Sequence, residues 1–236
     1  MTIYRRLLRA FGPQGWWPVT PAGKTAPVYA PGFYGRLTEN NIFEICAGAI
    51  LTQNTAWKNV EQALRALKKS EKLSLGKIAV CPLPALAALI RSSGYHNQKA
   101  ARLKELARRI MREHPEGLAA WFAQAPGSDL RAELLSFKGV GPETADSIAL
   151  YAARKPVFVI DAYTRRIAGR LGLAGGLDYA GWQAFFERSL PRNMKMYNEY
   201  HALLVKLGKD FCRKNRPACS GCPLNAVCAK LYHDEY

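Results

Sequence analysis

The segment from Leu134 to Asp161 constrains the fold of this chain more than any other. It predicts two helices joined by a tight turn, because apolar residues at helical spacing flank the sequence Gly139-Val140-Gly141-Pro142. The two glycines are expected to adopt backbone angles that other residues resist, and Pro142 fits the first turn of the second helix. The residues expected to shape the two helices are the cap Ser128, the apolar Leu130, Leu134 and Phe137, and the small face Ala145, Ile148, Ala149 and Ala152.

Such a turn points the backbone N–H groups of a helix N-terminus outward, and this arrangement binds anions. Asp161 follows the turn in sequence and ends the short apolar run of residues 157–160. A lone carboxylate at the end of an apolar run suggests a chemical centre. The segment therefore predicts a phosphate-binding turn beside a reactive carboxylate.

The formal net charge of +16 over 236 residues predicts a polyanionic partner. A solvated basic surface explains the charge equally well, so charge alone does not identify nucleic acid. No apolar run is long enough to span a membrane, and the first eleven residues lack the apolar core of a signal peptide. We therefore expect a cytoplasmic protein, at the nucleoid of a bacterial or archaeal cell.

Helical periodicity dominates the rest of the chain, and strand patterns are nearly absent. We expect an all-α fold in which residues 19–36 form an irregular loop rich in Pro and Gly. Asn97 is expected to cap the helix that follows it. The expected helices run near residues 1–11, 42–50, 57–67, 84–93, 97–110, 162–172, 178–189 and 193–208.

Four of the six cysteines close the chain in the pattern Cys212-x6-Cys219-x2-Cys222-x5-Cys228. A reducing compartment disfavours disulfides, so clustered cysteines indicate a metal site. Zinc usually takes two Cys-x2-Cys pairs, and only one pair occurs here. Cubane iron–sulfur clusters accept such uneven spacing. The pattern favours an iron–sulfur cluster and leaves zinc or unligated thiols open.

These motifs together resemble the endonuclease III family, which belongs to the helix–hairpin–helix superfamily of base-excision DNA glycosylases. The resemblance covers nearly the whole chain and rests on Asp161, the four cysteines and the hairpin Leu135-x3-Gly139-Val140-Gly141-x2-Thr144-Ala145. It implies a six-helix barrel domain over residues 42–155 and a second helical domain built from residues 1–41 and 156–236. It also implies a [4Fe-4S] cluster on Cys212, Cys219, Cys222 and Cys228.

The hairpin departs from the endonuclease III family at Glu143. Bifunctional members carry a lysine directly ahead of the threonine, and its amine forms a Schiff base with the sugar. A carboxylate cannot form an imine, so β-elimination through this residue is excluded. Lys138 belongs to the phosphate-facing side of the turn and is not the expected nucleophile. The resemblance therefore implies a monofunctional enzyme without AP lyase activity.

The 3-methyladenine DNA glycosylases of the same superfamily resemble the chain more closely. The similar segments are Trp16-Trp17-Pro18, Leu51-Thr52-Gln53-Asn54-Thr55, Ser93-Gly94-Tyr95-x-Asn97-Gln98-Lys99-Ala100 and Gly141-x-Glu143-Thr144-Ala145-Asp146. This subgroup removes alkylated purines and has the same glutamate in its hairpin. Some of its members lack the iron–sulfur cysteines and others keep them. The loop of residues 20–36 is longer than the subgroup leads us to expect.

Asp161 is the expected catalytic residue, because an ionised carboxylate stabilises an oxocarbenium-like sugar and orients the attacking water. An Asp that opens a helix is by itself more often an N-cap, and the resemblance favours catalysis. An N3- or N7-alkylated purine is already cationic, so aromatic faces suit its pocket, with about 1–2 kcal/mol of cation–π attraction. The expected pocket residues are Trp16, Trp17, Pro18, Trp57 and Glu143, although core packing explains Trp57 equally well and helix-dipole pairing explains Glu143 equally well.

Gln53 resembles the family's wedge, which fills the space left by a flipped base, with a helix-capping loop as the alternative. The expected DNA-binding residues are Gln53, Lys99, Lys138, Gly139, Val140, Gly141 and Thr144. We thus predict a monomeric, monofunctional glycosylase that flips an alkylated purine, chiefly 3-methyladenine, out of double-stranded DNA and hydrolyses its N-glycosidic bond. The alternatives are a glycosylase for mismatched, oxidised or deaminated bases, and a non-catalytic DNA-binding module.

Overall fold

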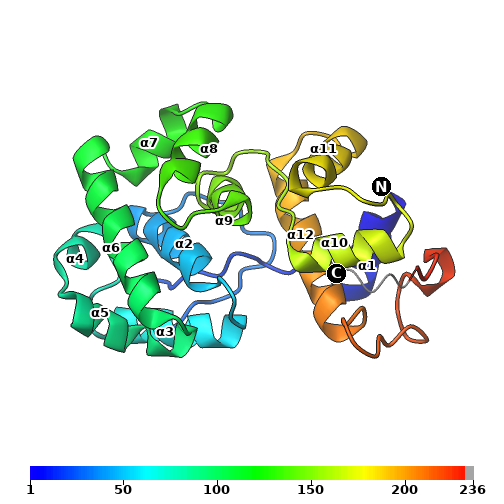
Figure 1. The fold of residues 1–236 in the computed structure, drawn as a ribbon, viewed down its shortest axis with the longest axis horizontal. Helices are drawn as coiled ribbons and strands as arrows, with labels where there is room; N and C mark the ends of the chain where they lie inside the picture. The colour runs from blue at the N-terminus through cyan, green and yellow to red at the C-terminus, as the bar shows by residue number, and fades with distance from the viewer. Residues whose placement is uncertain (232–236) are drawn as a thin grey trace. The chain divides into compact units, whose positions relative to one another are not determined.

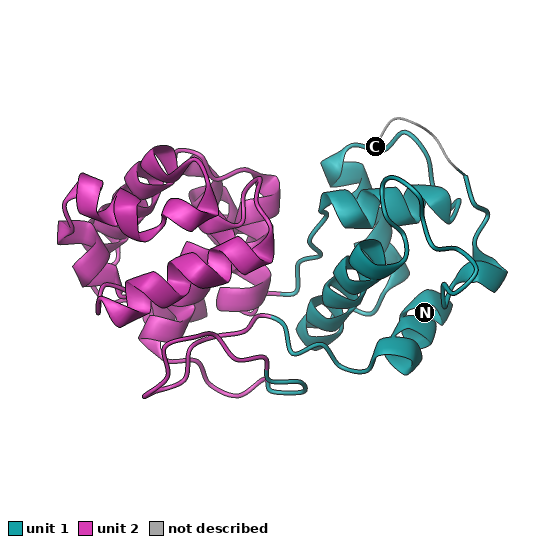
Figure 2. Ribbon diagram, turned by 90° about the horizontal axis from the view of Figure 1, so that it is seen from below, with its two compact units in different colours: residues 1–16, 30–33, 156–236 teal, residues 17–29, 34–155 magenta. Residues whose placement is uncertain are grey.

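The chain folds into α-helices and irregular segments, in a computed structural model that describes residues 1–231. Over this range the predicted all-α class is confirmed, and the sole β pairing is an isolated bridge between Val19 and Val28. No described helix has both the length and the apolar character of a membrane span. The chain divides into two compact units (Figure 2): unit 1 holds residues 1–16, 30–33 and those from 156 onward, and unit 2 holds residues 17–29 and 34–155.

Helix α2 (Glu39–Leu51) is the core helix of unit 2. Every residue from 42 to 51 is buried, as expected of a helix that other helices surround. It packs against α3, α6, α7, α9 and a π-helical turn. The elements of unit 2, labelled in Figure 1, are α2 (Glu39–Leu51), α3 (Trp57–Lys69), α4 (Leu75–Val80), α5 (Leu83–Leu89), α6 (His96–Glu113), α7 (Leu118–Gln124), α8 (Gly127–Ser136), α9 (Pro142–Ser147), a 3₁₀ turn (Arg91–Ser93) and the π-helical turn (Ile148–Ala152).

The segment of residues 17–29 belongs to unit 2, together with residues 34–41, and not to the other domain as the sequence suggested. A buried carboxylate on the core helix holds it there. Glu44 is 2% exposed and accepts hydrogen bonds from the backbone N–H of Thr20 at 2.9 Å and from its hydroxyl at 2.5 Å. Burial raises the pKa of Glu44, although the Thr20 hydrogen bonds oppose the rise. The periodicity of α2 gave no sign of this contact, because Glu44 stands in an otherwise apolar stripe.

The predicted helix–turn–helix is present as α8, a turn over residues 137–141, and α9. Gly139 has a φ of 83°, which is the left-handed region that favours glycine. Gly141 has a φ of −92°, so the expectation of unusual backbone angles is wrong for this residue. Ser128 does not cap α8, because the helix begins earlier, with Pro126 in the cap position. The Asn97 cap is also wrong, since α6 begins at His96.

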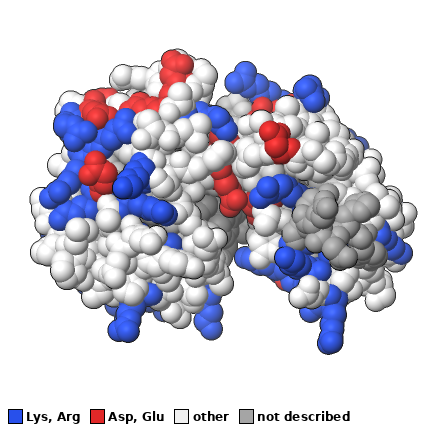
Figure 3. Space-filling model, in the orientation of Figure 1, with Lys and Arg blue, Asp and Glu red and all other residues white. Residues whose placement is uncertain are grey.

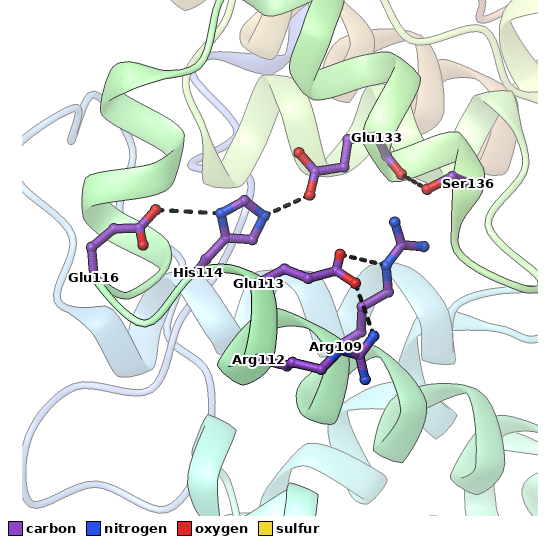
Figure 4. A network of polar contacts seen from close by, with 7 residues as sticks. All are labelled: Arg109, Arg112, Glu113, His114, Glu116, Glu133 and Ser136. Carbon is purple, nitrogen blue, oxygen red and sulfur yellow. Dashed lines mark hydrogen bonds and ion pairs between the residues drawn. The ribbon is translucent and has the colours of Figure 1, made fainter.

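Two polar contacts fix the helices of this hairpin. Arg131 on α8 donates to the carboxylate of Asp146 on α9, with Nε 2.7 Å from Oδ1, and the Asp146 side chain is fully buried. On the opposite side of α8, Glu133 lies 2.5 Å from Nε2 of His114 (Figure 4). The ring of His114 also stacks on Trp121. These contacts join α8 both to its partner helix and to the segment after α6.

Unit 1 is organised around the buried helix α12 (Met194–Asp210), which packs against α1 and α10. Phe158 stacks on Phe186 with ring centroids 4.4 Å apart, and the Tyr200 ring meets Phe158 nearly at right angles. The helices of unit 1 are α1 (Thr2–Phe11), α10 (Ala162–Arg170), α11 (Tyr179–Ser189), α12 (Met194–Asp210) and a 3₁₀ turn (Asn225–Val227). The helices expected from spacing in this part of the chain are therefore confirmed to within two residues at each end, with the last five residues outside the described range.

Candidate functional site

Asp161 is the N-cap of α10, and each of its carboxylate oxygens has a polar neighbour. Oδ1 accepts the backbone N–H of Thr164 at 2.7 Å, and Oδ2 lies 3.5 Å from Nε2 of His201 on α12. Burial by itself raises the pKa of Asp161, but His201 and the Thr164 hydrogen bonds outweigh burial and hold the pKa below its usual value. The carboxylate is therefore ionised at neutral pH while it remains only 13% exposed.

The capping and catalytic interpretations of Asp161 are compatible in this geometry. The cap uses Oδ1, whereas Oδ2 faces an imidazole and keeps capacity to accept a further hydrogen bond. His201 was missed by the sequence analysis. It occupies one position in a long buried helix, and nothing in its neighbours' spacing marks it. Its only sequence signal is a histidine on an otherwise apolar stripe.

Gln53 joins the turn before α3 to the hairpin. Its amide nitrogen donates to the carbonyl of Gly139 at 2.9 Å and to the hydroxyl of Thr144 at 3.0 Å, and its amide oxygen accepts from Arg102 at 2.8 Å. The structure therefore brings together three residues that the sequence predicted to bind DNA, with Arg102 of α6 as a fourth member. Because the amide braces the hairpin, a wedge role for Gln53 requires these hydrogen bonds to open.

Of the four hairpin residues expected to contact phosphates at residues 138–141, three are exposed and one is buried. Gly139 and Lys138 are exposed on the turn, as is Gly141 at the start of α9. A Cβ atom at Gly141 would meet nothing within 4 Å, so neither packing nor backbone angle requires glycine there. The expected phosphate contact of the Val140 amide is wrong, because this N–H donates to the Phe137 carbonyl at 3.0 Å and the side chain is buried.

The expected phosphate contact of Lys99 is also not present. It was expected to contact phosphates, but it is 1% exposed and its ammonium donates to the carbonyls of Leu51 at 2.8 Å and Ser93 at 2.7 Å. Burial, with a smaller contribution from Arg102, lowers the pKa of Lys99 to about 8. Lys99 thus supports the end of α2, directly before the segment that carries Gln53. The phosphate contact is wrong because the side chain turns into the core.

The aromatic residues expected in a base pocket lie in different parts of the chain. Trp16 falls in unit 1, whereas Trp17 and the buried Pro18 fall in unit 2. The Trp17 ring packs on Trp57 at 5.2 Å and on Tyr151 at 5.4 Å between ring centroids.

A glycine in α2 makes room for this cluster. A Cβ atom at Gly48 would lie 2.9 Å from Cζ2 of Trp17, which is closer than packed atoms approach. Tyr151 belongs to the π-helical turn that follows α9, and such turns often mark functional sites. Both residues were missed by the sequence analysis. A glycine inside an apolar helix was the one available signal, since it indicates a close approach.

The four terminal cysteines line one small cavity in unit 1, with Arg170 and Phe211 among its other walls. None of them forms a disulfide, and the Arg170 guanidinium lies 3.5 Å from the Cys212 sulfur. As placed, no group of three or more Cys, His, Asp or Glu within residues 1–231 is arranged to hold a single metal ion. A single zinc ion draws its sulfur ligands to about 2.3 Å, whereas a cubane cluster binds each thiolate through a different iron. Four thiols around one cavity are the donor set that a [4Fe-4S] cluster requires.

The sequence of this chain matches a known protein family. Residues 47–192, which include the end of α2, the hairpin and Asp161, match the family model described as HhH-GPD superfamily base excision DNA repair protein. The chain belongs to this superfamily. An archaeal protein of Methanocaldococcus jannaschii, provisionally named a DNA repair glycosylase, is 40% identical over 96% of this chain and 94% of its own length. The DNA-repair family expected from the hairpin, Asp161 and cysteine motifs is thus confirmed.

Solved structures of HhH-GPD proteins have the same fold. Helicobacter pylori 3-methyladenine DNA glycosylase bound to 1,N6-ethenoadenine is 30% identical, covers 74% of this chain and 90% of its own, and has a TM-score of 0.64. A non-covalent endonuclease III–DNA complex has a TM-score of 0.73, covers 97% and 93% of the two chains, and is 20% identical, which shows a shared fold. Endonuclease III of Thermotoga maritima is 26% identical over 80% of this chain and 84% of its own.

Glu143 stands at the hairpin position directly ahead of Thr144, where bifunctional members of the endonuclease III family are expected to carry a lysine. It lies in the first turn of α9 and is exposed. A carboxylate at a helix N-terminus complements the helix dipole, so its position is explained without a role in recognition.

Proposed function

We propose that this HhH-GPD protein is a monofunctional DNA glycosylase that removes alkylated purines, chiefly 3-methyladenine, from double-stranded DNA. The observation that carries the proposal is the ionised carboxylate of Asp161, buried against His201 at the start of α10. The reaction breaks the bond between the base nitrogen and C1′ of the sugar, and the bonding electrons leave with the base. Water then attacks C1′ and loses a proton. An ionised carboxylate stabilises the positive sugar and accepts that proton.

A cationic base suits this chain because its candidate pocket residues are aromatic. An N3-alkylated adenine leaves as a neutral base, so no side chain has to protonate it. The rings of Trp17, Trp57 and Tyr151 lie together in unit 2, with Trp57 and Tyr151 buried, and we assign the binding of such a base to this electron-rich cluster. We assign Pro18 and Glu143, which also belong to unit 2, to the edges of the same site. A 30% identical relative is named a 3-methyladenine glycosylase, which supports the substrate class.

The hairpin is the proposed phosphate-binding element. Lys138, Gly139 and Gly141 are exposed on it, and the open space beside Gly141 lets a phosphate approach the backbone. Thr144 and Gln53 hold the turn in shape from the inside. Contacts of this kind position the duplex and leave recognition of the lesion to the base pocket.

Exchange of Asp161 for Asn tests the proposal. Asn is as good an N-cap as Asp, so the variant keeps α10 but loses the charge. Asp161→Asn should reduce single-turnover release of 3-methyladenine by about 100-fold or more and leave DNA affinity unchanged. Asp178→Asn is the matched control, because Asp178 also caps a helix of unit 1, through the Gly181 N–H at 2.8 Å. Full activity of Asp161→Asn would refute the mechanism.

The absence of lyase activity rests on Glu143 and has its own test. Wild-type protein should leave the strand intact without alkali, and borohydride should trap no enzyme–DNA adduct. Glu143→Lys places an amine at this exposed position of α9 and serves as the positive control for trapping. An adduct with the wild-type protein would show that another amine acts as the nucleophile.

We also propose that Cys212, Cys219, Cys222 and Cys228 hold a [4Fe-4S] cluster, on the strength of the cavity that they share. The cluster would stabilise the loop after α12, and no reaction step is assigned to it. Anaerobically purified protein should absorb near 400 nm and contain iron and sulfide in equal amounts. Stoichiometric zinc without iron would overturn this assignment.

A further inference from the structure

Unit 2 contains a second basic feature that the proposed reaction does not use. It is a groove of about 770 Å³ between one face of α6 and residues 136–138, which lead into the hairpin turn. We call it the α6 groove. Its charged lining residues are five cations and one carboxylate: Arg102, Lys104, Arg108, Arg109, Lys138 and Glu105. In Figure 3, Lys and Arg gather on the front of unit 2, where α6 lies in Figure 1.

Two of these cations are held in place without being neutralised. The Lys104 ammonium donates to the Cys81 carbonyl at 2.5 Å, and Nε of Arg108 donates to the Ala79 carbonyl at 3.0 Å. A carbonyl orients a cation but carries no net charge, so the positive charge remains available to an anion. Arg109 differs, because it pairs with Glu113 at 2.7 Å (Figure 4). Its guanidinium also lies over the Phe137 ring.

The α6 groove is continuous with the proposed phosphate-binding turn. Lys138 lines the groove and directly precedes Gly139, and a Cβ atom at Gly139 would overlap Arg102, which lines the groove from the other side. From Arg102 to Arg109 the helix rises about 10 Å, at about 1.5 Å per residue. This length exceeds the axial rise of about 3.4 Å per phosphate of one DNA strand, so the groove can face more than one phosphate.

We propose that the α6 groove is a second DNA contact, which holds the phosphodiester backbone of the duplex that flanks the site bound by the hairpin. The occupant is duplex DNA because the groove continues the hairpin surface and its fixed cations form a row and not a single pocket. The contact adds affinity that depends on neither lesion nor sequence. It rests on the proposed function for the presence of DNA, and it assigns a role to Lys104 and Arg108 that base removal does not need.

The test is the salt dependence of binding to an undamaged duplex. The double variant Lys104→Gln/Arg108→Gln removes two phosphate contacts, so the slope of log K against log salt should become shallower by about 1.8. The matched control is Arg65→Gln/Lys69→Gln, which removes the same charge from exposed positions on α3. The control should keep the wild-type slope, and Lys104→Arg/Arg108→Lys should also keep it, because the charge is retained. Thermal unfolding of each variant verifies the fold.

The outcomes separate this inference from the proposed function. Equal slopes for the double variant and the α3 control would overturn the α6 groove as a DNA contact. If wild-type protein binds undamaged duplex with the steeper slope but releases no base, the glycosylase proposal fails while the groove stands.

Discussion

Exchange of Gly139 for Ala should destabilise the hairpin through two effects that can be calculated separately. The φ of 83° costs a residue with a side chain about 1–2 kcal/mol. The new Cβ would overlap Nε of Arg102 and lie 2.6 Å from its Cδ, so the arginine must move and lose its 2.8 Å hydrogen bond to Gln53. That loss is worth about 1 kcal/mol. Reduced freedom of the unfolded chain returns about 0.4–1 kcal/mol, so the net loss is about 2 kcal/mol.

Urea denaturation measures this change, and Gly141→Ala is the matched control. Gly141 has an ordinary φ of −92° and open space around it, so its exchange should change stability by only about 0.5 kcal/mol. Combining Gly139→Ala with Arg102→Ala removes the overlap, and the two changes should then cost less than the sum of their separate effects. The reasoning would be refuted if the Gly139→Ala protein were as stable as wild type. It would also be refuted if the Gly141→Ala protein were less stable than the Gly139→Ala protein.

Three further predictions concern buried groups. Arg131→Met should cost about 2–3 kcal/mol in unfolding free energy, because Asp146 is fully buried, whereas Arg112→Met at an exposed ion pair should cost under about 0.5 kcal/mol; equal losses would contradict this. The pKa of Asp161 is lower in the folded than in the unfolded protein, so its contribution to stability is complete at neutral pH and is lost as the pH falls below about 4. Denaturation at pH 7 and pH 3 should therefore show a smaller loss of stability in acid for Asp161→Asn than for wild type. The same pH dependence in both proteins would contradict this prediction. Gly48→Ala should shift the Trp17 fluorescence and cost about 1 kcal/mol, since overpacking outweighs the gain in helix propensity, and Trp17→Leu should relieve the cost; an unchanged spectrum would count against the close packing.

The sequence was sufficient to predict elements that local spacing determines. The helices of unit 1, the glycine turn and the cysteine loop follow from periodicity, backbone preference and motif spacing within short windows. Asp161 could be singled out because it ends an apolar run and opens a helix. In each case the deciding interactions lie within a few residues along the chain.

The remaining features depend on contacts that are distant in sequence. Lys99 was assigned to the surface because charged residues are usually exposed, but two carbonyls from other segments draw its ammonium inside. His201 was missed because its relevant neighbour, Asp161, lies forty positions earlier in the chain. The close approach at Gly48 likewise depends on Trp17, which lies about thirty positions earlier in the chain. No single-chain periodicity specifies such pairs, because the partner is fixed only when the helices pack.

The local caps failed for a related reason. Asn97 and Ser128 are good cap residues, yet the helices start before them. The N-cap of α6 is Tyr95, whose φ of 45° is rare for an aromatic residue. The N-cap of α8 is Pro126. Cap preference is worth about 1 kcal/mol, so packing of the whole helix readily moves its first residue.

The most direct test of the account is the product formed from duplex DNA that carries one 3-methyladenine. Wild-type protein should release the free base in stoichiometric amount and leave an intact strand that breaks only after alkali, while Asp161→Asn binds the same duplex and releases none. Release of another base in preference to 3-methyladenine would contradict the substrate class. Strand breakage by the wild-type protein without alkali would contradict the role assigned to Glu143.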